Sequence, residues 1–278
     1  MNDIVFIGSS SLGLKFLSKN PNFNVTDILC LKNRVNKKLI KLANYLKIKI
    51  KIFHWKNDFN DIITQYPKNY LFFIYQLDMI VPDVLTKKYR FFNLHRGSLY
   101  NNRGRNPEIR SILNGSNSTV LSLHKINEKI DSGILIDEYK IQISELDNTN
   151  TLKNKLERGI PKLVDSLYIY ILGNLKGVKI INGTYFPPVK EEDFIINIKT
   201  DSLEIISRKI RSQSPYNGAI LFHKGIKYYV EDFSFNDKMI KNSEKNLIFK
   251  KNKHTLKFQI NLKPKYKSPP IFPNSKRV

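Results

Sequence analysis

Short apolar runs alternate with segments of helical periodicity along the first two-thirds of this chain of 278 residues. Residues 4–8 (IVFIG) and 70–75 (YLFFIY) are apolar throughout or nearly so, as in strands buried on both faces of a sheet. Residues 37–47 and 106–115 instead carry apolar side chains at helical spacing. This βαβα order predicts an α/β fold, with a doubly wound, Rossmann-like and mainly parallel sheet.

The composition changes after residue 183. Residues 183–194 are rich in proline and charge and are predicted to form a linker or crossing loop. One helical segment follows at residues 202–212, and then several short β-type runs such as AILFH and IKYYVEDF. We therefore predict a first domain over residues 1–183 and a small β-rich domain over residues 184–278, with the proline-containing C-terminal residues extended over the surface.

The chain is strongly basic, with 47 Lys and Arg against 24 Asp and Glu and a net charge of +23. This excess favours anionic partners such as nucleic acid, phosphorylated metabolites, polyglutamylated cofactors or anionic lipid, and it does not choose between them. Cys30 is the single cysteine and lies in an apolar run, so an intrachain disulfide is excluded and a reducing, cytoplasmic location is expected. With no secretory segment at residues 1–8 and no run of 18 apolar residues, no membrane partner is expected.

A polar pair follows the apolar start of the strand FFNLH at residues 91–95. Asn93 and His95 point to one side of this strand, at the carboxyl end where open α/β sheets place their ligand crevice. Asn can donate a hydrogen to an oxygen that gains negative charge, and His can accept a proton from an attacking nucleophile. The pair therefore suits nucleophilic attack on a carbonyl, although both side chains could instead bind loop backbone.

A third polar residue, Asp131, occurs in the turn sequence DSG that follows the strand containing His124. Its carboxylate could orient His95 or raise its basicity, whereas alone it would be interpreted as a turn former. His124 itself is interpreted as structural. The five histidines show no metal-ligand spacing, so no metal is expected.

The segments NLHRGSLYNNRGRNPE and LHKINEKIDSG together resemble the folate-dependent formyltransferase family. The residues that match in order and spacing are Asn93, His95, Ser98, Leu99, Arg103, Gly104, Pro107, His124, Asp131 and Gly133. The resemblance implies a formyltransferase fold and formyl transfer from 10-formyltetrahydrofolate to a primary amine. It also implies that Asn93 binds the formyl oxygen, that His95 acts as general base or holds that oxygen too, and that Asp131 positions His95.

The resemblance further implies two binding regions. The pterin of the folate would lie between residues 75–83 and 127–133. The folate-binding residues it implies are Gln76, Leu77, Met79, Ile80, Ser98 and Ile130. The residues implied for binding the amine substrate are Ser9, Asn102, Arg103, Arg105 and Tyr216.

Three amine acceptors are compatible with the resemblance: a nucleotide-linked amino sugar, the aminoacyl end of initiator tRNA, and glycinamide ribonucleotide. The Arg-Gly-Arg-x-Pro segment at residues 103–107 resembles the sugar enzymes, which implies a dTDP- or UDP-linked amino-deoxy sugar. The leading candidate is dTDP-4-amino-4,6-dideoxyglucose, used for O-antigen or lipopolysaccharide synthesis. The resemblance also implies a homodimer, with the C-terminal part serving dimerisation or acceptor binding.

Two other functions stay open. Methionyl-tRNA formyltransferase activity is favoured by the net charge of +23 and predicts salt-sensitive tRNA binding. A non-enzymatic, basic nucleic-acid-binding protein is the second alternative, but it gives the Asn-His-Asp set no role. Under the preferred sugar hypothesis, nucleic acid is not a partner.

Overall fold

The computed structural model describes residues 1–128, 131–235, 246–251 and 254–264, and the chain divides into two compact units. The first unit contains Met1–Arg103, Val120–Lys140 and Leu156–Tyr185. The second contains Gly104–Thr119, Ile141–Lys155 and the chain from Phe186 onward. The chain thus passes between the units several times. The domain boundary after residue 183 stays a prediction, and the proline-containing tail after residue 264 lies outside the described residues.

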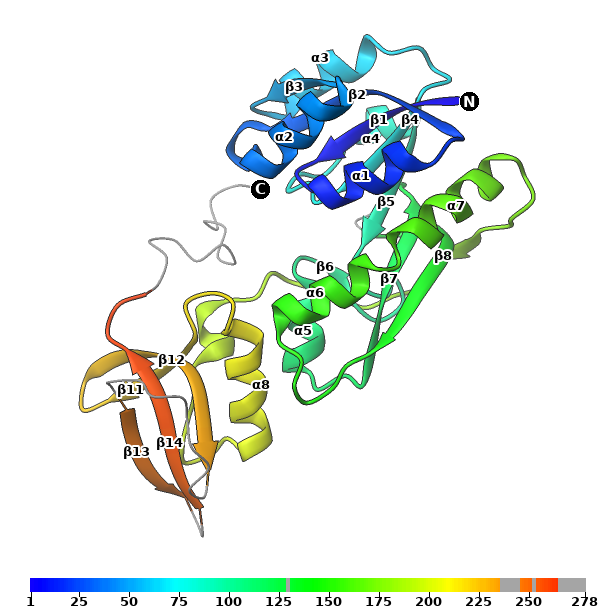
Figure 1. Cartoon of the computed structure of the whole chain (residues 1–278). Coiled ribbons are helices and arrows are strands. Elements are labelled where there is room, and N and C mark those ends of the chain that lie inside the picture. The colour runs from blue at the N-terminus through cyan, green and yellow to red at the C-terminus, as the bar shows by residue number, and fades with distance from the viewer. Residues whose placement is uncertain (129–130, 236–245, 252–253, 265–278) are drawn as a thin grey trace. The chain divides into compact units, whose positions relative to one another are not determined.

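An eight-stranded sheet with the order β3-β2-β1-β4-β5-β7-β8-β9 is the framework of the first unit (Figure 1). The strands are β1 (Asn2–Gly8), β2 (Phe23–Leu31), β3 (Lys49–Phe53), β4 (Leu71–Tyr75), β5 (Arg90–His95), β7 (Ser118–Lys125), β8 (Gly133–Gln142) and β9 (Val178–Ile180). Neighbours from β3 to β5 pair in parallel, whereas β5 with β7 and β8 with β9 pair antiparallel. The predicted Rossmann-like, mainly parallel sheet is confirmed, with antiparallel strands added at one side.

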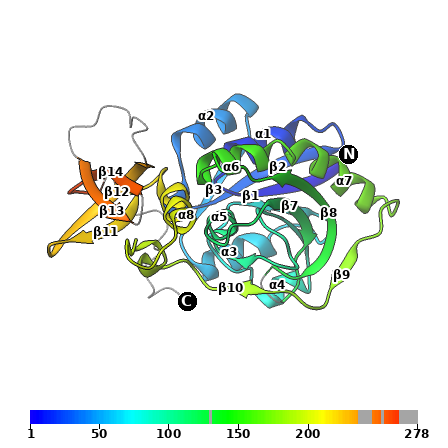
Figure 2. The same cartoon turned by 90° about the horizontal axis from the view of Figure 1, so that it is seen from below.

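Helices cover both faces of the parallel strands. They are α1 (Ser11–Lys19), α2 (Lys37–Leu46), α3 (Lys56–Thr64), α4 (Asp83–Thr86) and α7 (Ile160–Ile171), with a short 3-10 turn η1 at Lys32–Arg34. Most of α6 (Thr149–Glu157) belongs to the second unit. Figure 2 shows α1 on one side of β1, and α3 and α4 on the other. On the side of the sheet that carries α3 and α4, strand and helix side chains form one buried apolar cluster. It includes Val5, Ile7, Phe59, Ile63, Phe72, Ile74, Leu85 and Phe91. Phe72 and Phe91 stack at 4.8 Å between ring centroids.

Local sequence explains where several helices begin and end. The side chains of Ser10 and Asn36 cap α1 and α2 by accepting hydrogen bonds from backbone N–H groups in the first turn. The sequence predicted one helix over residues 148–175 with an interruption, and the structure has two helices that meet at Gly159. A Cβ on Gly159 would lie 2.3 Å from the Tyr139 ring. Close packing thus explains the glycine at this position, and the start of a new helix agrees with Pro161 in the first turn of α7.

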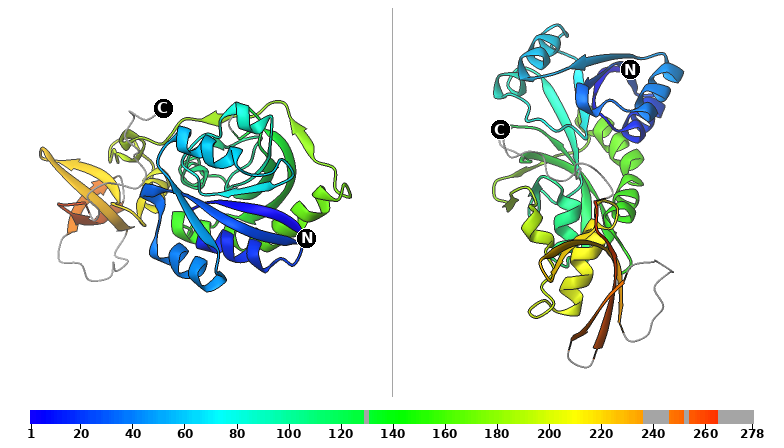
Figure 3. Two further views of the ribbon diagram at one scale, coloured as in Figure 1. Left: turned by 90° about the horizontal axis from the view of Figure 1, so that it is seen from above. Right: turned by 90° about the vertical axis from the view of Figure 1, so that its left-hand side faces the viewer.

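The second unit contains a four-stranded sheet of order β11-β12-β14-β13 with α8 (Leu203–Gln213) on one face (Figure 3). Its strands are β11 (Ala219–His223), β12 (Ile226–Phe235), β13 (Asn246–Lys251) and β14 (His254–Asn261), all paired antiparallel. Ile206 and Ile210 of α8 are buried against Leu221, Val230 and Phe258. This sheet agrees with the β-rich region that the sequence predicts.

Four smaller elements complete the fold: β6 (Arg103–Gly104), α5 (Pro107–Leu113), β10 (Tyr185–Phe186) and η2 (Glu191–Phe194). The sequence predicted residues 183–194 as a linker or crossing loop, but this segment includes a short strand and a 3-10 turn. Val189 and Phe194 are buried there beside Ile109 of α5, so apolar burial holds a segment whose prolines suggested an irregular loop. No helix in the described part of the chain is long and apolar enough to cross a membrane.

Candidate active site

The carboxyl end of β5 carries the polar pair Asn93 and His95 on one face of the sheet. Phe91, two residues before Asn93, is buried in the apolar cluster under α3 and α4. Since alternate residues of a strand share a face, Asn93 and His95 continue that face beyond the apolar core. His95 is buried and Asn93 is half-buried. The strand thus holds two polar side chains at the edge where ligands bind in open α/β sheets.

The antiparallel pairing of β5 with β7 brings a second histidine to this place. Asn93 lies opposite His124, and His95 lies opposite Ser122. Directly opposed side chains lie on the same face and close enough to interact. Asn93 Nδ2 is 3.0 Å from His124 Nε2, and the Ser122 hydroxyl donates to the carbonyl oxygen of Gly97 at 2.7 Å.

Asp131 comes from the loop between β7 and β8. Its Oδ1 atom lies 3.5 Å from Nδ1 of His95 and 4.0 Å from Nε2 of His124. The backbone of Asp131 is left-handed, with φ of 43°, a conformation that Asp adopts more readily than most residues. The structure therefore brings Asn93, His95 and Asp131 together, as the sequence predicted, from two separate segments of the first unit.

The His95 ring has an acceptor beside each nitrogen. Nε2 lies 2.8 Å from the carbonyl oxygen of Asn102, and a carbonyl can only accept, so Nε2 carries the hydrogen of this bond. Nδ1 faces the Asp131 carboxylate. These two acceptors hold the ring in one orientation, with Nδ1 beside the negative charge of Asp131. For His95 to accept a proton, either Nδ1 must take it or Nε2 must leave Asn102.

His124 has a different environment, because its side chain is only 1% exposed. Burial lowers its pKa to about 4, and the nearby Asp131 carboxylate opposes this shift only in part. The ring is therefore neutral near pH 7. Its Nδ1 is 3.3 Å from the Ser132 carbonyl oxygen, so both nitrogens have partners within the first unit.

Several solved structures with a similar fold are formyltransferases. A 4-N formyltransferase from Francisella tularensis superposes with a TM-score of 0.67 at 20% identity, covering 81% of this chain and 95% of that one. An N-formyltransferase from Helicobacter canadensis, in complex with folinic acid and dTDP-3-aminofucose, gives 0.66 at 19% identity, covering 94% and 100%. By sequence, methionyl-tRNA formyltransferase of Ehrlichia ruminantium is 31% identical over 166 residues.

The chain resembles the folate-dependent formyltransferases in sequence, and it has their fold. The resemblance inferred from the motifs is thereby confirmed. The sequence match covers 55% of this chain and 52% of the Ehrlichia relative, so the chain spans about half the length of the curated relatives it matches. No family model matches the chain.

In this formyltransferase fold, the loop after β5 is fixed by its own hydrogen bonds. Arg103 is buried, and its Nε donates to the Leu99 carbonyl oxygen at 2.6 Å. The backbone N–H of Asn102 donates to the Ser98 carbonyl oxygen at 2.8 Å, and the Ser98 hydroxyl accepts from the N–H of Tyr100. These residues thus shape the loop beside His95. Their role in binding folate or amine stays a prediction.

The residues predicted for the folate lie mainly around the carboxyl end of β4. Gln76 has a left-handed backbone, its carbonyl oxygen lies 3.4 Å from the Ser9 hydroxyl, and its amide donates to Glu157 Oε1 at 3.4 Å. Leu77 and Met79 pack partly against the apolar cluster under α3 and α4. Ile80 is 50% exposed, and Ile130 lies outside the described residues.

Arg105 and Tyr216, which were predicted to bind the amine substrate, lie in the second unit. Arg105 is half-buried. The Tyr216 hydroxyl accepts a hydrogen bond from Lys153 at 2.6 Å, and Lys153 also lies 3.4 Å from the fully buried Glu108. The Tyr216 ring packs against the buried Ile109 cluster. Tyr216 therefore takes part in the packing of its unit, and its contact with substrate stays a prediction.

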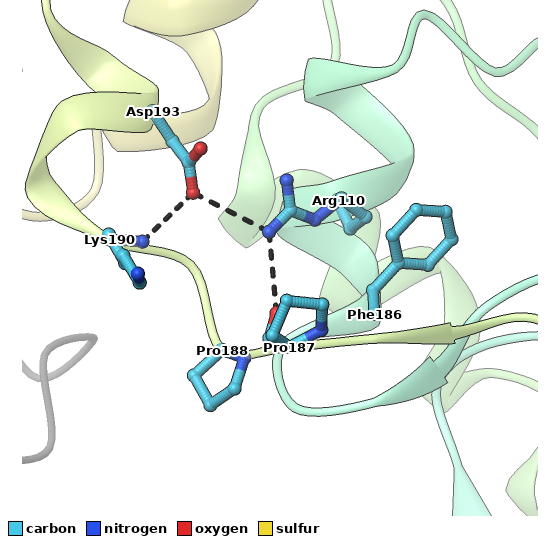
Figure 4. Close-up of a pocket in the computed structure, with 6 residues that line it drawn as sticks. All are labelled: Arg110, Phe186, Pro187, Pro188, Lys190 and Asp193. Atoms are coloured by element: carbon cyan, nitrogen blue, oxygen red, sulfur yellow. Dashed lines mark hydrogen bonds and ion pairs between the residues drawn. The ribbon is translucent and has the colours of Figure 1, made fainter. Parts of the chain in front are cut away.

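The second unit also contains a surface pocket of about 340 Å³ (Figure 4). Six residues line it: Arg110, Phe186, Pro187, Pro188, Lys190 and Asp193. The Arg110 guanidinium lies over the Phe186 ring at 5.5 Å and donates to the carbonyl oxygen of Pro187. It also pairs with Asp193 at 3.5 Å, and Asp193 accepts from the backbone N–H of Lys190. Arg110 and Asp193 therefore bind each other and the backbone of Pro187 and Lys190. We interpret the pocket as the place where these contacts hold residues 186–193 against α5.

The interpretation of His124 as structural missed one feature of the site, its contact with Asn93. The signal was present, because polar residues occur in both strands near the same predicted edge. What the sequence does not contain is the register of the antiparallel pair, which sets Asn93 opposite His124 rather than one residue away.

Proposed function

We propose that this protein transfers a formyl group from 10-formyltetrahydrofolate to the primary amine of a nucleotide-linked amino-deoxy sugar, with dTDP-4-amino-4,6-dideoxyglucose as the leading candidate. The observation that carries the proposal is the pairing of His95 with Asp131 at 3.5 Å, beside Asn93, at the carboxyl end of β5. The fold shared with sugar N-formyltransferases supports it.

The chemistry that these side chains can perform matches formyl transfer. The donor supplies an activated formyl carbonyl. The amine nitrogen attacks the formyl carbon, and the carbonyl oxygen gains negative charge that the Asn93 amide can stabilise by a hydrogen bond. The bond between the formyl carbon and the folate nitrogen then breaks, and the proton lost by the amine is transferred to that nitrogen. His95, oriented by Asp131, is the group proposed to carry this proton.

A nucleotide-linked sugar is preferred as acceptor because of the Arg-Gly-Arg-x-Pro segment and the near-complete coverage of the sugar enzymes, 95% and 100% of their chains. Methionyl-tRNA formyltransferase activity is the second candidate. Two observations favour it: the relative with 31% identity and the net charge of +23. We also propose that the protein acts in the cytoplasm as a homodimer and serves surface polysaccharide synthesis.

One assay separates the two acceptors. Purified protein is incubated with 10-formyltetrahydrofolate and, in separate reactions, with dTDP- and UDP-linked 3-amino and 4-amino sugars or charged initiator tRNA. Formation of tetrahydrofolate and of the formylated acceptor is followed. Turnover with one amino sugar, absent from the His95→Ala variant, supports the proposal. Turnover with tRNA alone would instead establish the second candidate.

A further inference from the structure

His124 makes a direct hydrogen bond to the proposed oxyanion-binding residue. Asn93 Nδ2 and His124 Nε2 are 3.0 Å apart, and the two residues face each other in the β5–β7 ladder. His124 is 1% exposed. Contact with solvent or substrate therefore does not explain a histidine at this position. Its place in the ladder connects it to Asn93.

The bonding partners of His124 define which nitrogen carries its hydrogen. The Ser132 carbonyl oxygen, 3.3 Å from Nδ1, can only accept, so Nδ1 is the nitrogen that bears the hydrogen. Burial keeps the pKa of His124 low, at about 4, so the ring is neutral and Nε2 bears no hydrogen near pH 7. The titratable groups that face the ring are Asp131, at 4.0 Å from Nε2, and His95.

A bare Nε2 fixes the direction of the Asn93 amide. Were the amide reversed, its carbonyl oxygen would face the lone pair of Nε2, with no hydrogen between the two acceptors. The NH2 group must therefore face His124 and donate one of its two hydrogens. The second amide hydrogen is then directed away from His124, so it can donate to an oxygen that gains negative charge.

We infer that His124 is a positioning residue: by accepting a hydrogen bond from Asn93, it holds the amide so that the remaining N–H is presented to the formyl oxygen during transfer. This inference rests on the proposed formyl transfer. The chain of contacts runs from the Ser132 carbonyl through the His124 ring to Asn93. Asp131, which pairs with His95, also lies 4.0 Å from His124 Nε2.

Kinetics of two His124 variants test the inference. His124→Leu fills the space but has no acceptor, and kcat should fall roughly ten- to hundredfold while the KM for 10-formyltetrahydrofolate changes little. His124→Gln has an acceptor oxygen and should recover most of that loss. Leu121→Ala removes a buried side chain from the same strand, outside the site, and serves as the control for general loosening of β7. An unchanged kcat in His124→Leu would overturn the inference.

A double-mutant cycle and a spectrum distinguish positioning from a purely structural effect. In the Asn93→Ala background, His124→Leu should have little further effect on kcat, since the amide it orients is gone. Independent losses in the two variants would contradict the inference. Nitrogen-15 spectra of the histidine rings at pH 7 should show His124 with hydrogen on Nδ1 and none on Nε2. The opposite tautomer would overturn it, even if wild-type protein formylates no acceptor and the proposed function itself fails.

Discussion

Nδ1 of His95 lies 3.5 Å from Oδ1 of Asp131, although the 35 residues between them include α5 and β7. The β5–β7 register and the loop that precedes β8 bring them together at one sheet edge. The second ring nitrogen of His95 is bound to the Asn102 carbonyl oxygen at 2.8 Å. The ring is therefore fixed in direction by two acceptors. For His95 to carry a proton during transfer, Nδ1 must take it or Nε2 must leave Asn102.

Replacing Asp131 tests the importance of this pair. Asp131→Asn keeps the size of the side chain but removes the charge that orients His95, so turnover should fall by about a hundredfold or more. Folding should be preserved, because the amide can adopt the same loop conformation. The measurement is kcat for formyl transfer, with circular dichroism as the check of fold.

Asp137→Asn is a suitable control for Asp131→Asn. Asp137 pairs with Lys162 at 2.9 Å and accepts from Ser166 at 2.7 Å, but none of these groups contacts His95. Its kcat should stay within about twofold of the wild type, since a partly exposed ion pair contributes little. An equal fall in kcat in the two variants would show that Asp131 has no specific role in formyl transfer.

The sequence predicted most of the parallel sheet because strands buried on both faces have an unambiguous apolar pattern. It also predicted that Asn93 and His95 share a face, since this follows from the two-residue period of a strand. Short elements were harder. The strands β9 and β10 have only three and two residues, too few for a pattern, and they are held by neighbours distant in sequence.

Contacts set by register were also beyond the sequence. A shift of one residue between β5 and β7 would place Leu123 opposite Asn93 and direct His124 to the other face. The fixed position of Asp131 similarly depends on a left-handed backbone in the turn. Such properties arise from tertiary packing, so the sequence could suggest the residues of the site and could not give their hydrogen bonds.

Burial of His124 should make the stability of the protein depend on pH. Its pKa is about 4 in the folded chain against an ordinary value of 6.5, mainly because burial disfavours the charged ring. Between these values the unfolded chain binds a proton that the folded chain does not, so stability should fall as pH drops from about 6.5 towards 4. The loss from this residue is at most about 3 kcal/mol. Urea denaturation at pH 7.0, 5.5 and 4.5 measures it.

The His124→Gln variant isolates this contribution from that of the carboxylates, because glutamine does not titrate. The fall in unfolding free energy between pH 7.0 and 4.5 should be smaller in the variant than in the wild type. Identical pH profiles for the two proteins would show that His124 does not exchange a proton on unfolding.

Cys30 should be unreactive in the folded protein. The side chain is fully buried in β2, and burial raises the pKa of its thiol to about 11. Since the thiolate is the reactive form, alkylation by iodoacetamide at pH 8 should be slower than for a free cysteine by at least about a hundredfold. Mass spectrometry counts the adducts, and labelling should become complete in urea. Rapid modification in native buffer would be incompatible with the packing of β2.

Gly8 should be essential for the junction between β1 and β4. Its backbone has φ of +138°, and a Cβ there would lie 1.9 Å from the carbonyl oxygen of Tyr75. Gly8→Ala therefore combines an unfavourable backbone with a clash against another strand, and the unfolding free energy should fall by more than about 2 kcal/mol.

Gly173→Ala is the matched control for Gly8→Ala. Gly173 also has positive φ, of +81°, but apart from its chain neighbours no atom of the described residues lies within 4 Å of the added Cβ. It should cost only about 1 kcal/mol, the price of the backbone conformation alone. Urea denaturation of both variants gives the difference. Because the residues after Gly8 and Tyr75 meet through the Ser9 hydroxyl and the Gln76 carbonyl oxygen, Gly8→Ala should also weaken folate binding, whereas Gly173→Ala should leave it unchanged. Equal destabilisation by the two substitutions would mean that the strands separate easily here, and the carboxyl ends of β1 and β4 could not then hold a defined binding edge.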